Sequence, residues 1–342
     1  MTQEIAINRP LVTFALFGYN QEKYIREAVE GAFSQTYEPL EIILSDDCSS
    51  DRTFDIMIEM AAEYQGQHDV SVVRQASNCG VMQHILSVSS HAAGDIIVVA
   101  AGDDIALETR VEILAECFSD ESVVAACSAA YIFSQAEKNW QIMKKMPIDF
   151  DFEVWFHGKK VIYLNGATAA YRKSFLTDIQ VPQIKIHFED LVFSTLAAIA
   201  GSTIKFCAEP LVHYRKHDEA LTNKTISSTD AQGIRARRQR HAVMHYDSCK
   251  FIMSRLNEYN EKNLETRALM RYQINKSIRR DFFISLVFSE SAFKRAYSII
   301  FLPSIFYMKE LILGVAGVRL HNCVLYLKHN LKQRVSEKRL TK

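Results

Sequence analysis

No stretch of this 342-residue sequence is apolar over the roughly 18 residues that predict a membrane-spanning helix. The most apolar stretch, residues 296–318, is interrupted by Pro303, Lys309 and Glu310. The first ten residues lack the basic start and apolar run of a secretory signal, and internal repeats and low-complexity segments are absent. We therefore expect a globular protein of the cytoplasm.

Metal-binding cysteine patterns are absent as well. None of the seven cysteines belongs to a CxxC pair, and no cluster of His and Cys has the spacing of a zinc site. A scattered, odd number of cysteines fits a reducing compartment, where most act as small buried apolar side chains. The seven are Cys48, Cys79, Cys117, Cys127, Cys207, Cys249 and Cys323.

The sequence also lacks net charge, because 40 basic side chains balance 40 acidic ones, but the two parts of the chain differ. Residues 231–342 carry 22 Lys and Arg against 8 Asp and Glu, so residues 1–230 have a net charge of −14. This asymmetry indicates an acidic body and a basic tail that meets an anionic partner. Lipid head groups and nucleic acid are the two candidates for that partner.

Short apolar runs alternate with amphipathic segments in the first hundred residues. The runs have the length of buried strands, and the segments between them carry apolar residues every three or four positions, as helices do. The expected strands are 11–17, 41–45, 70–74 and 95–100, and the expected helices are 22–34, 53–64 and 80–92. This alternation predicts a parallel α/β sheet, and the unbroken apolar character of the strands predicts that both of its faces are covered.

Polar pairs follow three of these strands, namely Tyr19-Asn20, Asp46-Asp47 and Asp103-Asp104. Because open α/β sheets bind ligands beyond the carboxyl ends of their strands, we expect the three pairs to converge on one binding edge. Adjacent carboxylates repel each other, and a divalent cation removes that cost. A solvated turn in which Asp caps the next helix explains the acidic pairs equally well, so the residues alone leave both readings open.

The later part of the chain is less regular. The expected elements are a helix at 107–118, a strand at 123–133, a strand-turn-strand at 161–171 and a helix at 189–200. Glu189-Asp190 opens the last of these helices, where acids also stabilise the free amides of a helix start. The segment 222–232 has the composition of a linker, and the pattern beyond residue 230 is helical and basic.

Six stretches, taken in this order, resemble the family-2 glycosyltransferases, which are inverting enzymes with the GT-A fold. They cover roughly residues 10–222 and read VTFALFGYNQEKYIREAVEGAFSQTYEPLEIILSDDCSSDRT, NCG, AAGDIIVVAAGDD, NGATAAYRKSFL, FEDLVFSTLAAIAG and EPLVHYRKHDEALT. The resemblance implies a Rossmann-like, mostly parallel sheet flanked by helices in residues 1–222, with a nucleotide-sugar half at 10–104 and an acceptor half at 105–222. Residues 223–342 are then a basic, mostly helical C-terminal region.

The resemblance also implies an activity. The family transfers a sugar, of hexosyl or N-acetylhexosaminyl type, from a nucleotide-diphosphate donor, by family habit a UDP-sugar, to a hydroxyl of a glycan or lipid-linked acceptor. Many bacterial members build cell-surface polysaccharides. Asp190 matches the catalytic base, and Asp103, Asp104 and His217 match positions around an Mg²⁺ or Mn²⁺ ion that neutralises the leaving diphosphate.

The other site residues implied by the resemblance fall into two groups. The nucleotide is expected to bind Phe17, Tyr19, Asn20, Asp46, Asp47, Asn78, Gly80 and Asp103. The acceptor is expected to meet Trp155, Gly166, Ala167 and Glu189. The chain departs from the family at two places, because the first acid of the DxD metal motif falls at Ala101 and Phe17-Gly18 replaces the usual Pro-Thr.

The basic tail leaves two readings open. Its arginines are mixed with large apolar side chains, notably between Phe282 and Tyr307. Such helices suit packing on the catalytic domain or on a second subunit, and equally a peripheral position on an anionic membrane surface, at the inner face of the cell membrane.

Two other functions compete with an active transferase. The first is a catalytically inactive sugar-nucleotide-binding or assembly protein, which Ala101 favours. The second is a nucleic-acid-binding protein, which the basic tail suggests. The sequence has no RNA-binding signature and no GxGxxG fingerprint, so we expect no nucleic acid partner.

Overall fold

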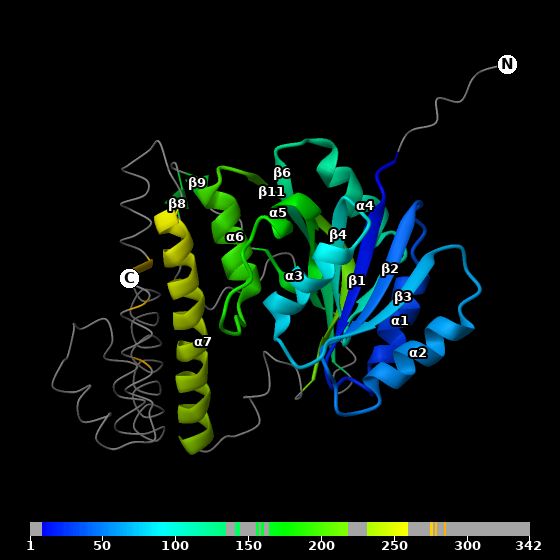
Figure 1. The fold of residues 1–342 in the computed structure, drawn as a ribbon, viewed down its shortest axis with the longest axis horizontal. Helices are drawn as coiled ribbons and strands as arrows, with labels where there is room; N and C mark the ends of the chain where they lie inside the picture. The colour runs from blue at the N-terminus through cyan, green and yellow to red at the C-terminus, as the bar shows by residue number, and fades with distance from the viewer. Residues whose placement is uncertain are drawn as a thin grey trace, which may run out of the picture. The chain divides into compact units, whose positions relative to one another are not determined.

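The computed structural model describes residues 9–134, 141–143, 155–156, 159–160, 164–217 and 231–258, together with residues 274, 275, 278 and 284. The chain divides into two compact units, which are residues 1–217 with 251–271 and residues 218–250 with 272–342. The first unit contains the sheet and its flanking helices (Figure 1). The expected domain boundary at residue 222 stays a prediction.

A parallel α/β half opens the chain. Its elements are β1 (Val12–Gly18), α1 (Ile25–Phe33), β2 (Leu40–Asp46), α2 (Thr53–Glu63), β3 (Asp69–Arg74), α3 (Val81–His91) and β4 (Ile96–Ala101). The four strands pair in parallel in the order β3-β2-β1-β4. The expected alternation of strands and helices is therefore confirmed, with small shifts at the ends of the elements.

The second half extends the same sheet in the order β4-β10-β6-β11-β5, with β7 beside β6. Its elements are β5 (Ile105–Ala106), α4 (Arg110–Glu116), β6 (Val123–Ser134), β7 (Gln141–Met143), β8 (Trp155–Phe156), β9 (Lys159–Lys160), β10 (Ala169–Arg172), α5 (Lys173–Thr177), α6 (Glu189–Ile199) and β11 (Thr203–Lys216). Two 3₁₀ turns complete it, η1 (Cys117–Ser119) and η2 (Gly166–Thr168). β10 runs antiparallel to both of its neighbours, β4 and β6.

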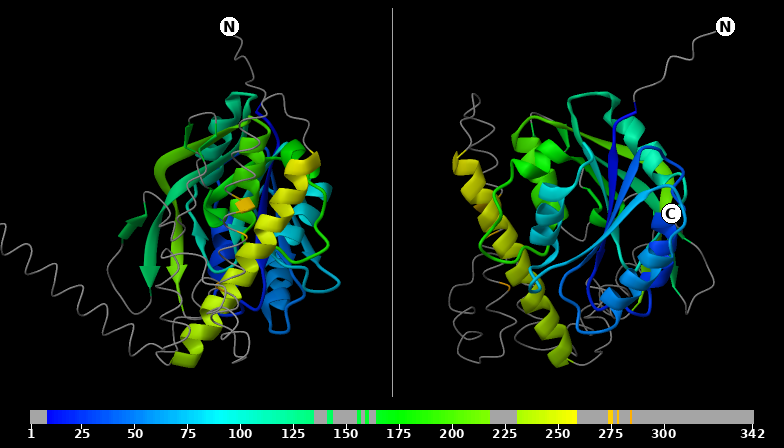
Figure 2. Two further views of the ribbon diagram at one scale, coloured as in Figure 1. Left: turned by 90° about the vertical axis from the view of Figure 1, so that its left-hand side faces the viewer. Right: turned by 45° about the vertical axis from the view of Figure 1, so that its right-hand side comes forward.

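Alternate side chains of the central strands face two different helical layers. Val12, Phe14 and Leu16 of β1 are buried in one cluster with apolar side chains of α1, α2 and α4. On the opposite face, Ser45 of β2 bonds to His84 of α3. Figure 2 shows α1, α2 and α4 on one side of the sheet and α3, α5 and α6 on the other.

Two details differ from the sequence expectation. The prediction that both faces of all four strands are covered is wrong for β3, whose side chains are mostly exposed or half-buried because it is the edge strand. The expected helix 107–118 is shorter, since α4 starts at Arg110 and ends in the tight turn η1. In the segment 161–171, the η2 turn and β10 match the expected turn and second strand, and residues 161–163, where most of the first strand was expected, lie outside the described residues.

The C-terminal region begins with the long helix α7 (Ala231–Glu258), as the helical pattern predicts. Among the residues that the structure describes, no helix is both long and apolar enough to cross a membrane. Almost all of the stretch from Phe282 to Tyr307 lies outside the described residues. Packing on a second subunit and contact with a membrane surface therefore both stay predictions.

Candidate active site at the carboxyl ends of the strands

The carboxyl ends of β2, β1 and β4 lie side by side. Gly18 pairs with Asp46, and the amide of Asp47 donates to the carbonyl of Gly18 at 2.9 Å. The amide of Gly102 donates to the carbonyl of Phe17 at 2.8 Å. The three polar pairs found in the sequence therefore leave the sheet at one edge, as the parallel order requires.

Asn20 joins the loop after β1 to the loop after β2. Its backbone has a φ of 52°, a left-handed conformation that Asn tolerates better than most residues. Its amide donates to Ser49 Oγ at 2.9 Å, and its Oδ1 accepts from the Ser50 amide at 2.8 Å. This tie leaves the neighbouring Tyr19 side chain 41% exposed at the rim of the strand ends, where an aromatic ring can stack on a base.

Phe17 packs below this rim. Its ring meets the ring of His84 edge-on, with the centroids 4.8 Å apart. His84 Nε2 lies 2.6 Å from Ser45 Oγ, and burial lowers the pKa of His84 to about 4, so the imidazole is neutral near pH 7. We infer that Phe17 forms the apolar floor of the expected nucleotide site.

Asp46 is fully buried, and one of its two carboxylate oxygens has no hydrogen bond to any residue that the structure describes. Oδ2 accepts from the Ser49 amide at 2.9 Å and lies 3.2 Å from Arg74 Nε. Oδ1 has no hydrogen-bond partner among the described residues. Leaving a buried acceptor unsatisfied costs about 1–3 kcal/mol, a cost that an N–H donor of a ligand would remove.

Asp47 supports the loop that follows β3. Its carboxylate accepts from the backbone amides of Cys79 and Gly80, at 2.8 and 3.0 Å, and from Asn78 Nδ2 at 2.9 Å. Burial and Asp47 together raise the pKa of the Cys79 thiol to about 12. Asn78 and Gly80 thus reach the strand ends through Asp47, and the geometry gives Asp47 the task of positioning this loop.

Asp103 and His217 face each other across the β4 end and the β11 end. The distance from His217 Nε2 to Asp103 Oδ2 is 3.0 Å, and the His217 ring lies 4.3 Å from the ring of Tyr24. Gly102 allows this close turn, because a Cβ there would lie 2.6 Å from Gln21 Oε1 and 3.0 Å from a carbonyl oxygen. A carboxylate and an imidazole, both partly exposed, are therefore adjacent where the resemblance expects a metal ion.

Asp104 points away from this pair into the core. Its Oδ1 accepts from the Arg215 amide at 2.8 Å, and burial followed by the charge of Asp103 raises its pKa well above the ordinary range. Arg215 in turn donates from Nε to the Asp103 carbonyl at 2.9 Å and from a terminal nitrogen to Glu27 at 2.9 Å. The geometry makes Asp104 and Arg215 positioning residues for Asp103 rather than part of the exposed pair.

Among the residues that the structure describes, no further protein ligand joins the predicted metal-binding trio. Within the described ranges, no three His, Cys, Asp or Glu side chains form a group that could hold a metal ion. Asp103 and His217 still fit a divalent ion as a partial ligand set that leaves positions for phosphate oxygens and water. Asp104 does not fit, because its carboxylate is buried and accepts from the Arg215 amide.

The acceptor side contributes Gly166 from η2 and two acids from the first turn of α6. A Cβ at Gly166 would lie 2.3 Å from Glu189 Oε1, so a larger residue would push this carboxyl away. Asp190 follows, with its Cβ 3.9 Å from that same point, and its Oδ1 accepts from the Leu191 amide at 2.7 Å. The structure thus brings together three residues expected at the acceptor and catalytic positions.

Arg110 holds the middle of the η2 turn from within the core. It donates to the carbonyl of Ala167 at 3.1 Å and to that of Val99 at 2.6 Å, and burial lowers its pKa to about 10. Ala167 therefore takes part through its backbone position. Trp155, also expected at the acceptor, lies in β8, but its side chain is outside the described part.

Glu189 gives the site a measurable pH dependence. Burial, followed by the charge of Asp190, raises the pKa of Glu189 from 4.5 to about 8. Between these values the native state holds a proton that the unfolded chain has released, so stability falls as pH rises through this window. We expect Glu189→Gln to lessen that decline in urea unfolding at successive pH values, while Glu63→Gln, on an exposed part of α2, leaves it unchanged. Equal slopes for Glu189→Gln and wild type would contradict the assignment.

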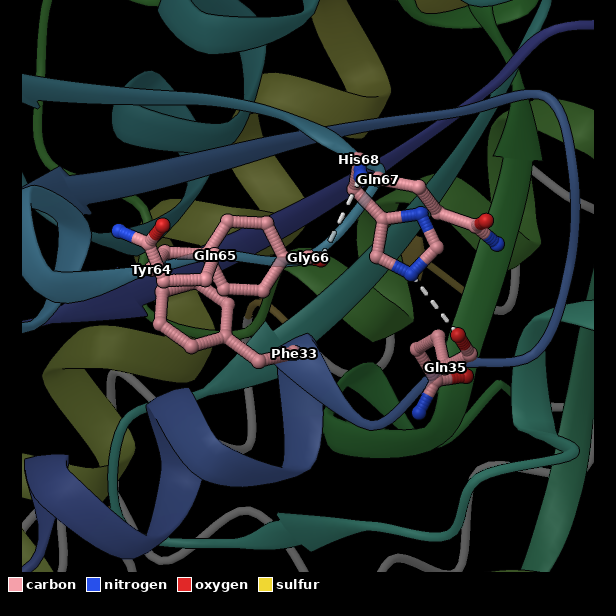
Figure 3. Close-up of a pocket in the computed structure, with 7 residues that line it drawn as sticks. All are labelled: Phe33, Gln35, Tyr64, Gln65, Gly66, Gln67 and His68. Atoms are coloured by element: carbon pink, nitrogen blue, oxygen red, sulfur yellow. Dashed lines mark hydrogen bonds between the residues drawn. The ribbon is translucent and has the colours of Figure 1, made fainter.

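A separate pocket lies at the amino ends of the strands, opposite to the candidate site. Figure 3 shows its lining, which is Phe33, Gln35, Tyr64, Gln65, Gly66, Gln67 and His68. These residues precede β2 and β3, so they lie at the amino ends of the strands. His68 Nε2 is 2.8 Å from the Gln35 carbonyl and Nδ1 is 2.8 Å from Glu38, so both ring nitrogens already have partners. The pocket lies away from the converging carboxylates.

Comparisons with known proteins fit this arrangement. Residues 17–179 match the family model described as Glycosyl transferase family 2. Over 226 residues the chain is 26% identical to the putative glycosyltransferase EpsH of Bacillus subtilis. This alignment covers 63% of this chain and 63% of EpsH. Over 211 residues it is 22% identical to the O-antigen chain rhamnosyltransferase RfbN of Salmonella typhimurium, covering 59% of this chain and 66% of RfbN. The chain thus spans less than two thirds of the length of either relative.

Two solved structures share the fold. TarS 1–349 of S. aureus, in complex with UDP-GlcNAc, superposes with a TM-score of 0.56 at 16% identity, over 89% of this chain and 79% of TarS. The mannosyltransferase PcManGT of Pyrobaculum calidifontis, in complex with GDP-Man and Mn²⁺, gives 0.55 at 16% identity, over 90% of this chain and 85% of PcManGT. At such identities the likeness shows the fold, and it confirms the expected GT-A architecture.

Proposed function

Because residues 17–179 match the model of glycosyl transferase family 2, we propose that this chain is a member of that family and that it transfers a sugar from a nucleotide-diphosphate donor to a hydroxyl of a glycan or lipid-linked acceptor. A UDP-sugar is the first candidate for the donor, with a hexosyl or N-acetylhexosaminyl group. TarS binds UDP-GlcNAc and PcManGT binds GDP-Man, so both nucleotides belong in the test. RfbN, an O-antigen chain rhamnosyltransferase, supports a polysaccharide acceptor.

One observation carries the proposal. The strand ends gather an unpartnered acceptor on Asp46, an exposed ring on Tyr19 and the Asp103–His217 pair. These groups supply what a nucleotide sugar needs, which is a hydrogen-bond acceptor and a stacking surface for the base and a place to neutralise the diphosphate.

The chemistry follows from these positions. Asp190 takes the proton of the acceptor hydroxyl, and the oxygen attacks the anomeric carbon as the bond from that carbon to the diphosphate oxygen breaks. Attack from the face opposite to the leaving group inverts the anomeric centre. Gly166 and Glu189 hold the acceptor hydroxyl near Asp190, because they border the same first turn of α6.

Asp103 and His217 are the residues that would hold Mg²⁺ or Mn²⁺ beside the diphosphate. When bound, the ion offsets the negative charge that builds up on the departing diphosphate. Arg215 and Asp104 contribute by fixing the backbone of Asp103.

Thermal-shift titration with UDP, GDP and dTDP, each with and without Mn²⁺, tests the proposal. A ligand that binds only the folded protein raises its melting temperature, by about 5–10 °C at a hundredfold excess over Kd. We expect one nucleotide to give this shift in the presence of the metal and a smaller shift in its absence. Pyrophosphate with Mn²⁺ is the control for plain anion binding. If none of the three nucleotides changes the melting temperature, the donor site proposed here does not exist.

Ala101 supports a second candidate function, a sugar-nucleotide-binding protein without catalysis, because it occupies the place of an acid in the metal motif. A turnover measurement distinguishes the two candidate functions. An active enzyme releases nucleoside diphosphate from its donor by transfer or slow hydrolysis, whereas the binding protein shows the thermal shift alone.

A further inference from the structure

Residues 181–187, between α5 and α6, form a segment that crosses to the nucleotide side of the site. Pro182 and Ile186 are buried. Gln83 of α3 donates from Nε2 to the Ile184 carbonyl and accepts from the Ile186 amide at 3.5 Å. The 181–187 segment is thereby fastened to the first turn of α3, and α6 with Asp190 follows directly after it.

Lys185 extends from this segment over the loop after β3. Its Nζ donates to Asn78 Oδ1 at 2.6 Å. Its aliphatic chain lies against Gly80, where an added Cβ would be 3.5 Å from Lys185 Cβ. Because Asn78 also donates to Asp47, a chain of hydrogen bonds runs from Lys185 to the carboxyl end of β2. The ammonium group is therefore at the edge of the expected nucleotide site.

The negative charge of the site indicates why a cation at the position of Lys185 matters. Asp46, Asp47 and Asp103 gather at the strand ends, and a diphosphate brings further negative charge. The nearby guanidinium groups are already engaged: Arg215 bonds to a carbonyl and Glu27, and Arg74 bonds to Asp46 and the Ser49 carbonyl.

Lys185 differs from these arginines in two respects. Its side chain is exposed, and Asn78 occupies one of the three N–H donors of its ammonium group. Asp190 lies five positions further along the chain, so the two Cα atoms are at most about 18 Å apart. A cation that can still donate hydrogen bonds thus lies beside the loop after β3, on the segment that leads into α6 and the proposed base.

We propose that Lys185 is a donor-binding residue, whose ammonium group bonds the diphosphate of the nucleotide sugar while Asn78 orients it. This inference rests on the proposed function. It adds Lys185, a direct contact from the protein to the diphosphate, to the Asp103–His217 pair that would hold the metal ion. Since charge-assisted hydrogen bonds contribute more than neutral ones, loss of the ammonium group weakens binding of the diphosphate and leaves binding of the nucleoside part unaffected.

The test compares Lys185→Met, which keeps the aliphatic packing on Gly80, with Lys185→Arg, which keeps the charge. Isothermal titration measures UDP and GDP directly, and uridine and guanosine by competition. We expect Lys185→Met to weaken binding of the nucleoside diphosphate about 10- to 100-fold, with nucleoside affinity and melting temperature unchanged. Lys185→Arg should restore most of the loss, and Lys205→Met, near the amino end of β11, should behave as wild type.

Two results would overturn the inference. One is wild-type affinity of Lys185→Met for the diphosphate, and the other is an equal loss for nucleoside and diphosphate, which would mean that Lys185 only supports the loop. Failure of the proposed function has a different signature, because the wild-type protein itself would then bind neither UDP nor GDP.

Discussion

Asp190→Asn is expected to lower kcat by about 10²–10⁴-fold, the contribution typical of a positioned general base. The amide has the shape of the carboxylate but cannot accept the proton of the acceptor hydroxyl. It can still accept the hydrogen bond from the Leu191 amide, so the first turn of α6 should stay folded. Donor affinity should stay near that of wild type, since most of the residues proposed to bind the nucleotide lie on the loops after β1, β2 and β3.

Two measurements decide this prediction. Initial rates of nucleoside diphosphate release give kcat, and thermal-shift titration gives donor binding for the same preparation. Asp178→Asn, on the exposed end of α5, is the matched control for the chemical change. Activity above a few per cent in Asp190→Asn would remove the base assignment, and the neighbouring Glu189 would then be the next acid to test.

Asp103→Asn is the second large effect that we expect. Removing one carboxylate from the Asp103–His217 pair should cost several kcal/mol of stabilisation of the leaving diphosphate, or about a 100-fold or greater loss in kcat/KM. The same variant should lose the metal-dependent part of the nucleotide shift in melting temperature. The backbone conformation at residue 103 should stay unchanged, because Arg215 bonds to the carbonyl of Asp103 and not to its side chain.

Asp69→Asn provides the control, because Asp69 is an exposed acid at the amino end of β3. A series of Mn²⁺ concentrations measures the apparent metal affinity of each variant at saturating nucleotide. If Asp103→Asn follows the metal curve of wild type, the metal is held elsewhere and the Asp103–His217 contact is only structural.

Sequence periodicity was enough to predict the architecture near the site. Apolar runs such as residues 11–17 form strands that are packed on both faces. Because these strands are parallel, Asp46 and Asp103 lie at the same carboxyl end of the sheet. The same reasoning fails at β3, because an apolar run at the edge of a sheet has one neighbour fewer and stays partly exposed.

The tasks of individual acids were beyond sequence reasoning. Asp103 and Asp104 are adjacent and chemically identical, yet one faces His217 and the other is buried against the Arg215 amide. Asp46 and Asp47 also differ in their partners, since of the two carboxylates only that of Asp47 bonds to the loop around Gly80. Such differences arise from partners more than 25 residues away in sequence, which no local pattern contains.

The positioning residues show the same limit. Arg215 belongs to the stretch EPLVHYRKHDEALT that carries the family resemblance, but only the fold reveals that it bonds to the turn after β4. Arg110 and Lys185 carry no motif, and each is identified by the groups that it contacts in space.

The Arg215 contacts bear on the kinetics of donor binding. This one side chain joins the turn after β4, the end of β11 and Glu27 of α1, segments that are up to 188 residues apart. The backbone of Asp103 and the end of β11, which His217 directly follows, are therefore fixed when the protein folds, before any donor arrives. The entropy of ordering them is not lost again on association, so the donor enters a preorganised site and its association rate should not be limited by rearrangement of this turn.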